Sequence, residues 1–316
     1  MTVDPALVAR FRKDLDALIA PGVRVGVAVS GGPDSLALLL LAAAARPGLI
    51  EAATVDHSLR EGSADEAATV AAVCARLGIP HQTLVADWAS PPTAAIQAEA
   101  RAMRYRLLGQ WAAVRGFPAV ATAHHADDQA ETLLMRLARG SGIAGLSGSR
   151  PTRPLLEGVA LIRPLLGWRK TDLVALVDAA GLDAVDDPSN RDPRHDRSRI
   201  RQFLRGADWL DPARLAASAA AIRDSDDAIE WALAPLLATR LERAGDRLTI
   251  HPVDLPREFR RRLLLAAFDA LEAPTPRGPD LMRAITALEA GATVTLSGLK
   301  LAGGAQWIIT QAPPPR

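Results

Sequence analysis

The sequence predicts an α/β fold built on a parallel sheet, followed by a smaller, mainly helical domain. Three short apolar runs, at residues 23–29, 49–55 and 118–123, are typical of buried strands. Stretches with helical character follow each of them, and strands that alternate with helices favour a parallel sheet. After Arg205 the chain changes character, because long Ala-, Leu- and Arg-rich stretches replace this alternation. We therefore expect two domains, residues 1–205 and residues 206–316.

The remaining elements are predicted from periodicity and punctuation by glycine and proline. A third strand is expected at residues 81–87, and Ser63 with Glu66 forms a capping-box pattern that predicts Ser63 as the N-cap of a helix. The helices expected in the first domain span residues 4–20, 36–45, 63–77, 94–115 and 169–180. Those expected in the second domain span residues 211–243, 256–272 and 280–290, with short strands at 248–251, 293–296 and 306–310.

Composition excludes several classes of protein. The 316 residues carry 37 Lys and Arg against 36 Asp and Glu, so the overall charge does not indicate a nucleic-acid partner, and any basic surface must be local. Cys74 is the only cysteine, so a disulfide within the chain and a Cys-x-x-Cys metal site are both excluded. The apolar runs are short, which argues against a membrane helix, and the first residues lack an apolar signal core. A cytoplasmic protein is expected.

Residues 30–35, with the sequence Ser-Gly-Gly-Pro-Asp-Ser, lie between the first strand and its helix. A glycine-rich turn at this point directs backbone N–H groups and the positive end of the helix toward one spot, where a phosphate binds. The pattern is neither a Walker A loop nor Gly-x-Gly-x-x-Gly. The alternative is an ordinary glycine turn in which Asp34 or Ser35 caps the helix.

Asp56 and His57 follow the second strand. In an open α/β sheet, ligands bind outside the carboxyl ends of the strands, so these two residues are candidates for the same crevice. The alternative is a turn aspartate beside a surface histidine.

A second polar cluster follows the fourth strand, with the sequence His124-His-Ala-Asp127-Asp128-Gln-Ala-Glu131-Thr. Acids in a first helical turn complement the helix dipole, which explains one carboxylate but not the histidines. His and Asp together can hold Mg²⁺-bound phosphates, bind an ammonium group or move a proton. The spacing differs from the zinc motif His-Glu-x-x-His. We expect a functional site here.

Three stretches of basic or glycine-rich sequence leave alternatives open. Arg101 and Arg104 share a helix face, where they can pair with acids such as Glu99 or reach a phosphate, and the sequence alone favours the pairing. Residues 139–149 contain four glycines and are interpreted either as a mobile loop over a ligand or as a surface turn. The third stretch is a basic linker, in which a solvated face and nucleic-acid contact both remain open; its arginines are Arg191, Arg194, Arg197, Arg199, Arg201 and Arg205.

Taken together, these segments resemble the tRNA(Ile)-lysidine synthetase family, ligases with a Rossmann-like PP-loop domain that cleave ATP to AMP and pyrophosphate. The resemblance is collinear over about residues 23–205. It is carried by residues 30–35, 55–60 (Val-Asp-His-Ser-Leu-Arg), 100–105, 123–132, 139–146, 163–166 (Arg-Pro-Leu-Leu), 187–190 (Asp-Pro-Ser-Asn) and 199–201.

The resemblance implies a reaction in two steps. ATP adenylates the C2 oxygen of the wobble cytidine in a CAU-anticodon isoleucine tRNA, and an amine of free lysine then displaces AMP to give lysidine. The implied cofactors are ATP and Mg²⁺, the implied partners are that tRNA and lysine, and a homodimer is expected from the resemblance alone.

The same resemblance implies roles for individual residues. ATP binding falls to Ser30, Gly31, Gly32, Pro33, Asp34, Ser35, Asp56 and His57. The catalytic residues are Asp34, Arg101, His124, Asp127 and Asp128, and which of the last three holds metal or moves a proton stays open. The tRNA contacts are Arg104, Arg191, Arg194, Arg197, Arg199 and Arg201.

Two departures from the family pattern bear on these roles. The family usually has Arg-Asn-Arg-Ile-Arg where this chain has Arg197-Ser-Arg-Ile-Arg201, and the part after residue 205 is short. Two other functions remain to be weighed. Another PP-loop enzyme that modifies tRNA is one, although the single cysteine counts against thiolation. A nucleotide-binding regulator without catalysis is the other, and the retained His-Asp-Asp cluster counts against it.

Overall fold

The computed structural model describes residues 3–59, 62–88, 96–185 and 196–313. The chain forms two compact units, Met1–Arg223 and Asp224–Arg316, which meet inside the long helix α9 (Pro212–Arg240). The division expected from sequence, after Arg205, lies earlier, at the end of α8 (Asp196–Arg205).

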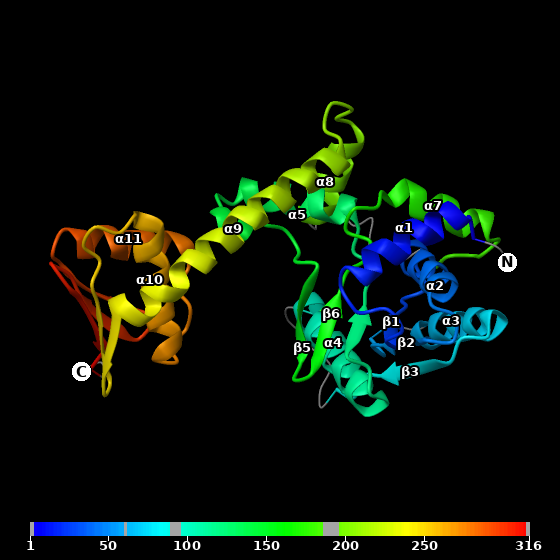
Figure 1. Ribbon diagram of the computed structural model, residues 1–316, viewed down its shortest axis with the longest axis horizontal. Helices are drawn as coiled ribbons and strands as arrows, with labels where there is room; N and C mark the ends of the chain where they lie inside the picture. The colour runs from blue at the N-terminus through cyan, green and yellow to red at the C-terminus, as the bar shows by residue number, and fades with distance from the viewer. Residues whose placement is uncertain (1–2, 60–61, 89–95, 186–195, 314–316) are drawn as a thin grey trace. The chain divides into compact units, whose positions relative to one another are not determined.

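The first unit is built on a six-stranded sheet with the order β3-β2-β1-β4-β6-β5 (Figure 1). Five strands are parallel, which agrees with the expected α/β fold, and β5 (Thr152–Leu156) pairs with β6 in the antiparallel direction at the edge. The parallel strands are β1 (Val25–Ala28), β2 (Ile50–Asp56), β3 (His81–Val85), β4 (Ala119–Ala121) and β6 (Val159–Ile162).

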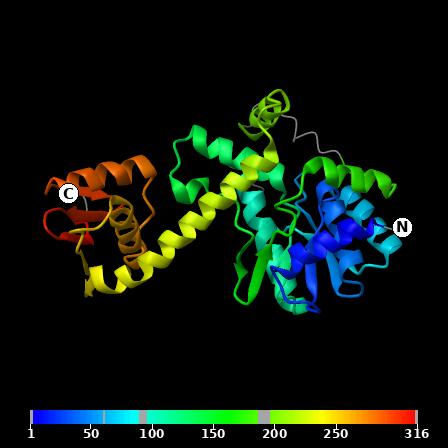
Figure 2. The ribbon, with the colours of Figure 1, turned by 45° about the horizontal axis from the view of Figure 1, so that its top comes forward.

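Helices cover both faces of this sheet because its central strands are apolar on both sides. One layer shares a continuous core with the sheet, and Figures 1 and 2 show α1, α2 and α7 together in it. This layer consists of α1 (Pro5–Asp16), α2 (Pro33–Ala45), α3 (Ser63–Leu77) and α7 (Lys170–Ala179). On the other face, α4 (Ile96–Arg115) packs through Leu108 and Trp111. A Cβ at Gly26 would lie 2.5 Å from the Trp111 ring, so β1 requires glycine there.

One local prediction is wrong. Ser63 is not an N-cap: the Gly62 carbonyl accepts the N–H of Glu66 and Gly62 has φ +90°, so glycine precedes the helix and no side chain caps it. The glycine-rich segment at 139–149 contains a one-turn helix, α6 (Ile143–Leu146). Two hydrogen bonds of 2.7 and 2.9 Å between Gln129 of α5 (Ala126–Ala138) and the backbone of Ser149 tie this segment down.

The second unit contains a five-stranded antiparallel sheet, ordered β7-β8-β11-β10-β9, packed against two helices. Arg262 is buried among Asp226, Glu230 and Glu258, so part of the arginine-rich stretch around it faces acids of its own unit. No helix in the described part of the chain is long and apolar enough to cross a membrane. The elements are α10 (Arg257–Ala270), α11 (Gly278–Glu289), β7 (Leu241–Ala244), β8 (Arg247–Ile250), β9 (Thr293–Leu296), β10 (Leu299–Ala302) and β11 (Trp307–Gln311).

Candidate active site

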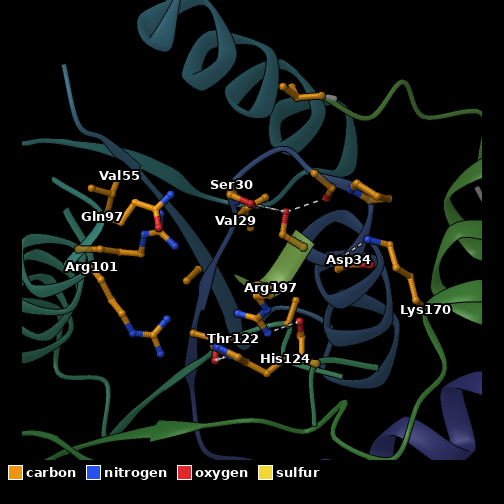
Figure 3. Close-up of a pocket in the computed structure, with 18 of the residues that line it drawn as sticks. Val29, Ser30, Asp34, Val55, Gln97, Arg101, Thr122, His124, Lys170 and Arg197 are labelled. Atoms are coloured by element: carbon orange, nitrogen blue, oxygen red, sulfur yellow. Dashed lines mark hydrogen bonds and ion pairs between the residues drawn. The ribbon is translucent and has the colours of Figure 1, made fainter. Parts of the chain in front are cut away.

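A pocket of about 690 Å³ opens at the carboxyl ends of β1, β2 and β4. Residues of α3, α4, α5, α7 and α8 complete its wall, and all of them belong to the first unit. Figure 3 shows Ser30, Asp34, His124 and Arg197 around the same space. Two of the three clusters expected from sequence, at residues 30–35 and 124–132, therefore meet in one site.

Residues 30–35 fold into a tight turn that is held by its own hydroxyl groups. The Ser30 N–H donates to Ser35 Oγ at 3.1 Å, and Ser35 Oγ donates to the Gly32 carbonyl at 2.8 Å. Gly31 has φ +86°, a conformation that favours glycine, and Gly32 is the N-cap of α2 without a side-chain cap. Neither Asp34 nor Ser35 is the cap, so the amino end of the helix is open to a ligand in the pocket.

Asp34 carries the first carboxylate of the site. Its Oδ2 lies 3.4 Å from His125 Nε2 and 3.6 Å from Lys170 Nζ. Its Oδ1 is buried and has no hydrogen-bond partner in the described part of the chain. An acceptor of this kind in a pocket is available to a cation or a donor on a ligand.

His125 is the N-cap of α5 and is almost completely buried. Its imidazole lies within 3.4 to 3.7 Å of carboxylate oxygens from Asp34, Asp127 and Asp128. Burial disfavours the charged imidazole, but the hydrogen bond to Asp34 and the charges of the three acids outweigh it and raise the pKa of His125. The ring therefore lies among three carboxylates, and its Nδ1 accepts the Asp128 N–H at 3.4 Å.

Asp128 is the carboxylate that faces into the pocket from α5. It accepts the backbone N–H of His125 at 3.1 Å and is 2.8 Å from the Arg197 guanidinium. Burial acts to raise the pKa of Asp128, yet the charges of His125 and Arg197 prevail and lower it. The carboxylate is ionised at neutral pH.

Asp127, one residue earlier, points to α7 instead. It accepts the Lys170 N–H at 2.8 Å and an Arg169 Nε–H at 3.3 Å, and it does not line the pocket. Its observed contacts fasten α7 to α5, and the catalytic role expected for Asp127 stays a prediction.

His124 lines the pocket next to Thr122, whose Oγ1 is 3.1 Å from His124 Nδ1. Burial lowers the pKa of His124 to about 4, the arginines around it act in the same direction, and Asp128 opposes them. The ring is therefore neutral at pH 7 and can serve as a hydrogen-bond partner or proton acceptor.

The basic linker expected at residues 191–205 is, in its described part, helix α8. Arg197 and Arg201, one turn apart, each contact buried Glu131 of α5 at 2.7 Å. The charge run therefore has an inward face that docks α8 on α5 and an outward face with exposed Arg199. Arg197 and Arg201 line the pocket rather than an exposed surface. Their contact with tRNA phosphates stays a prediction. Arg191, Arg194 and the segment 187–190 lie outside the described residues.

Arg101 and Arg104 reach the pocket from α4. In the described ranges neither forms an ion pair with Glu99, so the pairing favoured by sequence is absent there. Asp56 and His57 lie at the end of β2 but do not line the pocket. Asp56 accepts the Ser58 N–H at 2.8 Å. The ATP contacts expected of these two residues stay predictions.

The pKa of His57 is set by its burial and by two charged neighbours. Burial and the nearby Arg104, 3.4 Å from His57 Nε2, lower the pKa of His57 against the opposing charge of Asp56. The ring is neutral and faces α4.

The residues present are compatible with a magnesium ion that is held mainly by phosphates. No group of three or more His, Cys, Asp or Glu side chains within the described ranges forms a metal cage. Mg²⁺ in nucleotide sites is bound by one or two carboxylates plus substrate phosphates. Asp34, with its unpartnered Oδ1, and Asp128 supply that number.

Three residues of the site were not predicted from sequence as members: His125, Glu131 and Lys170. His125 and Glu131 stood inside a cluster that was recognised, but their contacts depend on Asp34 and on α8. Lys170 begins α7, and only the tertiary fold brings it to Asp34.

Comparisons with known proteins agree with this geometry. Residues 7–207 match the PP-loop domain family. A tRNA(Ile)-lysidine synthase of Novosphingobium aromaticivorans is 47% identical over 96% of this chain and 94% of its own length, and one of Zymomonas mobilis is 43% identical over 92% and 89%.

Among solved structures, the U34-tRNA thiolase NcsA of Methanococcus maripaludis shares the fold, with a TM-score of 0.56 and 18% identity over 71% of this chain and 79% of that one. The loop at residues 30–35, the cluster at 124–132 and the extended identity to curated synthases lead to one assignment. This chain belongs to the tRNA(Ile)-lysidine synthase family and contains its ATP-binding PP-loop domain.

Proposed function

We propose that this protein uses ATP to join free lysine to C2 of the wobble cytidine in a CAU-anticodon isoleucine tRNA. One observation carries the proposal: a helix terminus suited to phosphate, an ionised carboxylate and a neutral histidine line one pocket. This is the combination that a nucleotide-activating step and an amine-transfer step both require.

In the first step, the C2 oxygen of cytosine attacks the α-phosphorus of ATP. A carbon-linked O–P bond forms, the bond from the α-phosphorus to the bridging oxygen breaks, and pyrophosphate leaves. The backbone N–H groups of Gly31, Gly32 and Asp34 meet the phosphates, and Lys170, 3.6 Å from Asp34, contributes a cation. Mg²⁺, held by Asp34, by Asp128 and by the phosphates, would neutralise charge on the leaving group.

In the second step, an amine of lysine attacks C2 and AMP leaves with the oxygen. One C–N bond forms, one C–O bond breaks, and the amine loses a proton. Asp128 attracts the lysine ammonium because it is ionised, and neutral His124 beside it can accept a hydrogen bond from the amine, whose proton passes to water. Binding and orientation of the amine are thus divided between neighbouring residues.

A labelling assay tests the proposal. The protein is incubated with ATP, Mg²⁺, labelled lysine and CAU isoleucine tRNA, with methionine tRNA, which also carries CAU, as the control. We expect label in the isoleucine tRNA only. Absence of label there, or equal label in both, contradicts the proposal. A homodimer stays a prediction, which light scattering in solution tests.

Thiolation is the competing function, because the solved structure with a similar fold is a tRNA thiolase with a [4Fe-4S] cluster. The only cysteine of this chain, Cys74, is buried in the core of the first unit, and burial raises its pKa to about 11. It supplies neither a cluster ligand set nor a reactive thiolate. Lysine transfer is therefore favoured.

A further inference from the structure

Arginines surround Tyr105, the only tyrosine of the chain, on the α4 side of the pocket. The Arg101 guanidinium lies 5.0 Å and the Arg153 guanidinium 4.4 Å from the centre of the ring. Arg104 shares the helix with Tyr105, and Arg163, after β6, interacts with it. We call Arg101, Arg104, Arg153 and Arg163 the arginine wall.

The arginine wall has no acidic partner among the described residues. In the described part of the chain, none of its guanidiniums is within ion-pair distance of a carboxylate, whereas Arg169, Arg197 and Arg201 of the same pocket region all pair with acids. Arg163 is 4% exposed, and its Nε has no hydrogen-bond partner there. Partly buried cations without acids make a site for an anion.

The pKa shifts of Arg104 and Arg163 also favour an anion site at the arginine wall. Burial lowers the pKa of Arg104, and the charge of Arg101 adds to the effect. Burial also lowers the pKa of Arg163, with Arg153 and Arg101 acting in the same direction. Both guanidiniums carry like charge, because the ordinary pKa of arginine lies far above neutral pH, and a bound anion would relieve their mutual repulsion.

Arg101 and Arg104 of the wall, with Tyr105, and the loop at residues 30–35 line different parts of one pocket, while Arg153 contacts the ring of Tyr105 and does not itself line the pocket. Figure 3 shows Arg101 and Gln97 across the pocket from Asp34 and Lys170. The loop has its own phosphate donors in the helix terminus. Two separate anion sites in one pocket suit two phosphate-bearing substrates.

We propose that the arginine wall binds a backbone phosphate of the tRNA, next to the nucleotide whose base enters the pocket, while residues 30–35 bind the phosphates of ATP. This inference rests on the proposed function. An inserted base brings its phosphodiester with it, and arginine forks match phosphate oxygens in two-point contact. Holding that phosphate fixes the base in front of the α-phosphorus.

The test compares Arg104→Gln and Arg153→Gln with Arg24→Gln. Arg24 is a matched control because it also stacks on an aromatic ring, 4.8 Å from the centre of Phe117, but it is paired with Glu51 and lies away from the pocket. Dissociation constants for Mg-ATP and for CAU isoleucine tRNA are measured across a salt series, with unfolding curves to check folding.

We expect about tenfold weaker tRNA binding by each wall variant, a salt slope smaller by about one, and ATP binding within twofold of the parent. The Arg24→Gln variant should match the parent in both. Weaker ATP binding with unchanged tRNA binding would assign the wall to ATP and overturn the inference, and unchanged binding of both ligands would overturn it as well. A parent protein that binds the tRNA but forms no lysidine would overturn only the proposed function.

Discussion

Two neighbouring histidines, His124 and His125, lie in opposite electrostatic surroundings. His124 faces the arginines of the pocket, and its pKa falls to about 4, mainly through burial. His125 is more deeply buried, yet three carboxylates raise its pKa. Adjacent residues at the extended end of a strand point in opposite directions, so one dipeptide separates the two environments.

This difference shows that carboxylates gather on one side of the dipeptide and arginines on the other. On the His125 side, a buried imidazole lies among Asp34, Asp127 and Asp128, next to the helix terminus that we propose receives phosphate. On the His124 side, a neutral ring lies beside the arginine wall, where a second anion is expected. A site that brings two polyanions and an ammonium together needs such separation, because like charges in one place would repel each other.

The largest effect is expected on the His125 side, from Asp34→Asn. Loss of this carboxylate removes the proposed metal ligand and the partner of Lys170, so kcat should fall about 1000-fold. Pyrophosphate release measures it. Asp65→Asn, which removes an exposed acid from the first turn of α3, is the control and should retain parental activity. Equal losses in the two variants would reduce Asp34 to a helix-dipole role.

Next in size is the effect of Glu131→Gln, which tests how α8 is held. The side chain of Glu131 is 3% exposed and neutralises two arginines, so its loss should lower the free energy of unfolding by about 3 kcal/mol. Asp196→Asn breaks the exposed pair Arg139–Asp196 between α5 and α8. It should change the free energy of unfolding by less than about 1 kcal/mol. Urea titration measures both variants, and equal values would show that α8 docks by other contacts.

Asp128→Asn separates the two chemical steps. If Asp128 acts on lysine, the variant should form lysidine about 100-fold more slowly but still release pyrophosphate in the presence of the tRNA. Quenched-flow assays of the two products measure this. An equal loss of lysidine and pyrophosphate would instead assign Asp128 to the ATP-cleaving step.

The smallest effects come from pH, and they have opposite signs for the two histidines. The folded state resists protonation of His124, so relative to His124→Gln the parent should gain ~2–3 kcal/mol of stability as pH rises from about 4 to 6.5. The folded state favours protonated His125, so relative to His125→Gln the parent should lose stability as pH rises above 6.5. Unfolding free energies across this range test both slopes, and slopes of the same sign would contradict the comparison.

Much of this site was accessible from the sequence because its chemistry is local. The loop at residues 30–35 and the cluster at 124–132 each follow an apolar run, and parallel strands bring such ends to one edge. The arrangement within the cluster could not be predicted from the sequence. Asp127 and Asp128 are adjacent, but Asp127 contacts α7 and Asp128 lines the pocket.

The sequence was least informative where contacts between distant residues determine the local structure. Residues 196–205 looked like a solvated basic linker because helix docking through Glu131 leaves no local signal. Strand β5 was missed because it is short, lies at the sheet edge and contains Pro154, which weakens any strand pattern. The arginine wall joins α4 to the β5–β6 hairpin, so its prediction needed that strand.

One measurement tests the central claim, that this pocket uses ATP to adenylate a tRNA base before lysine enters. Pyrophosphate release is followed with Mg-ATP and CAU isoleucine tRNA while lysine is left out. The account predicts release that depends on this tRNA and proceeds without lysine, followed by transfer of lysine when it is added. Release that is indifferent to the tRNA, or that requires lysine, would contradict it.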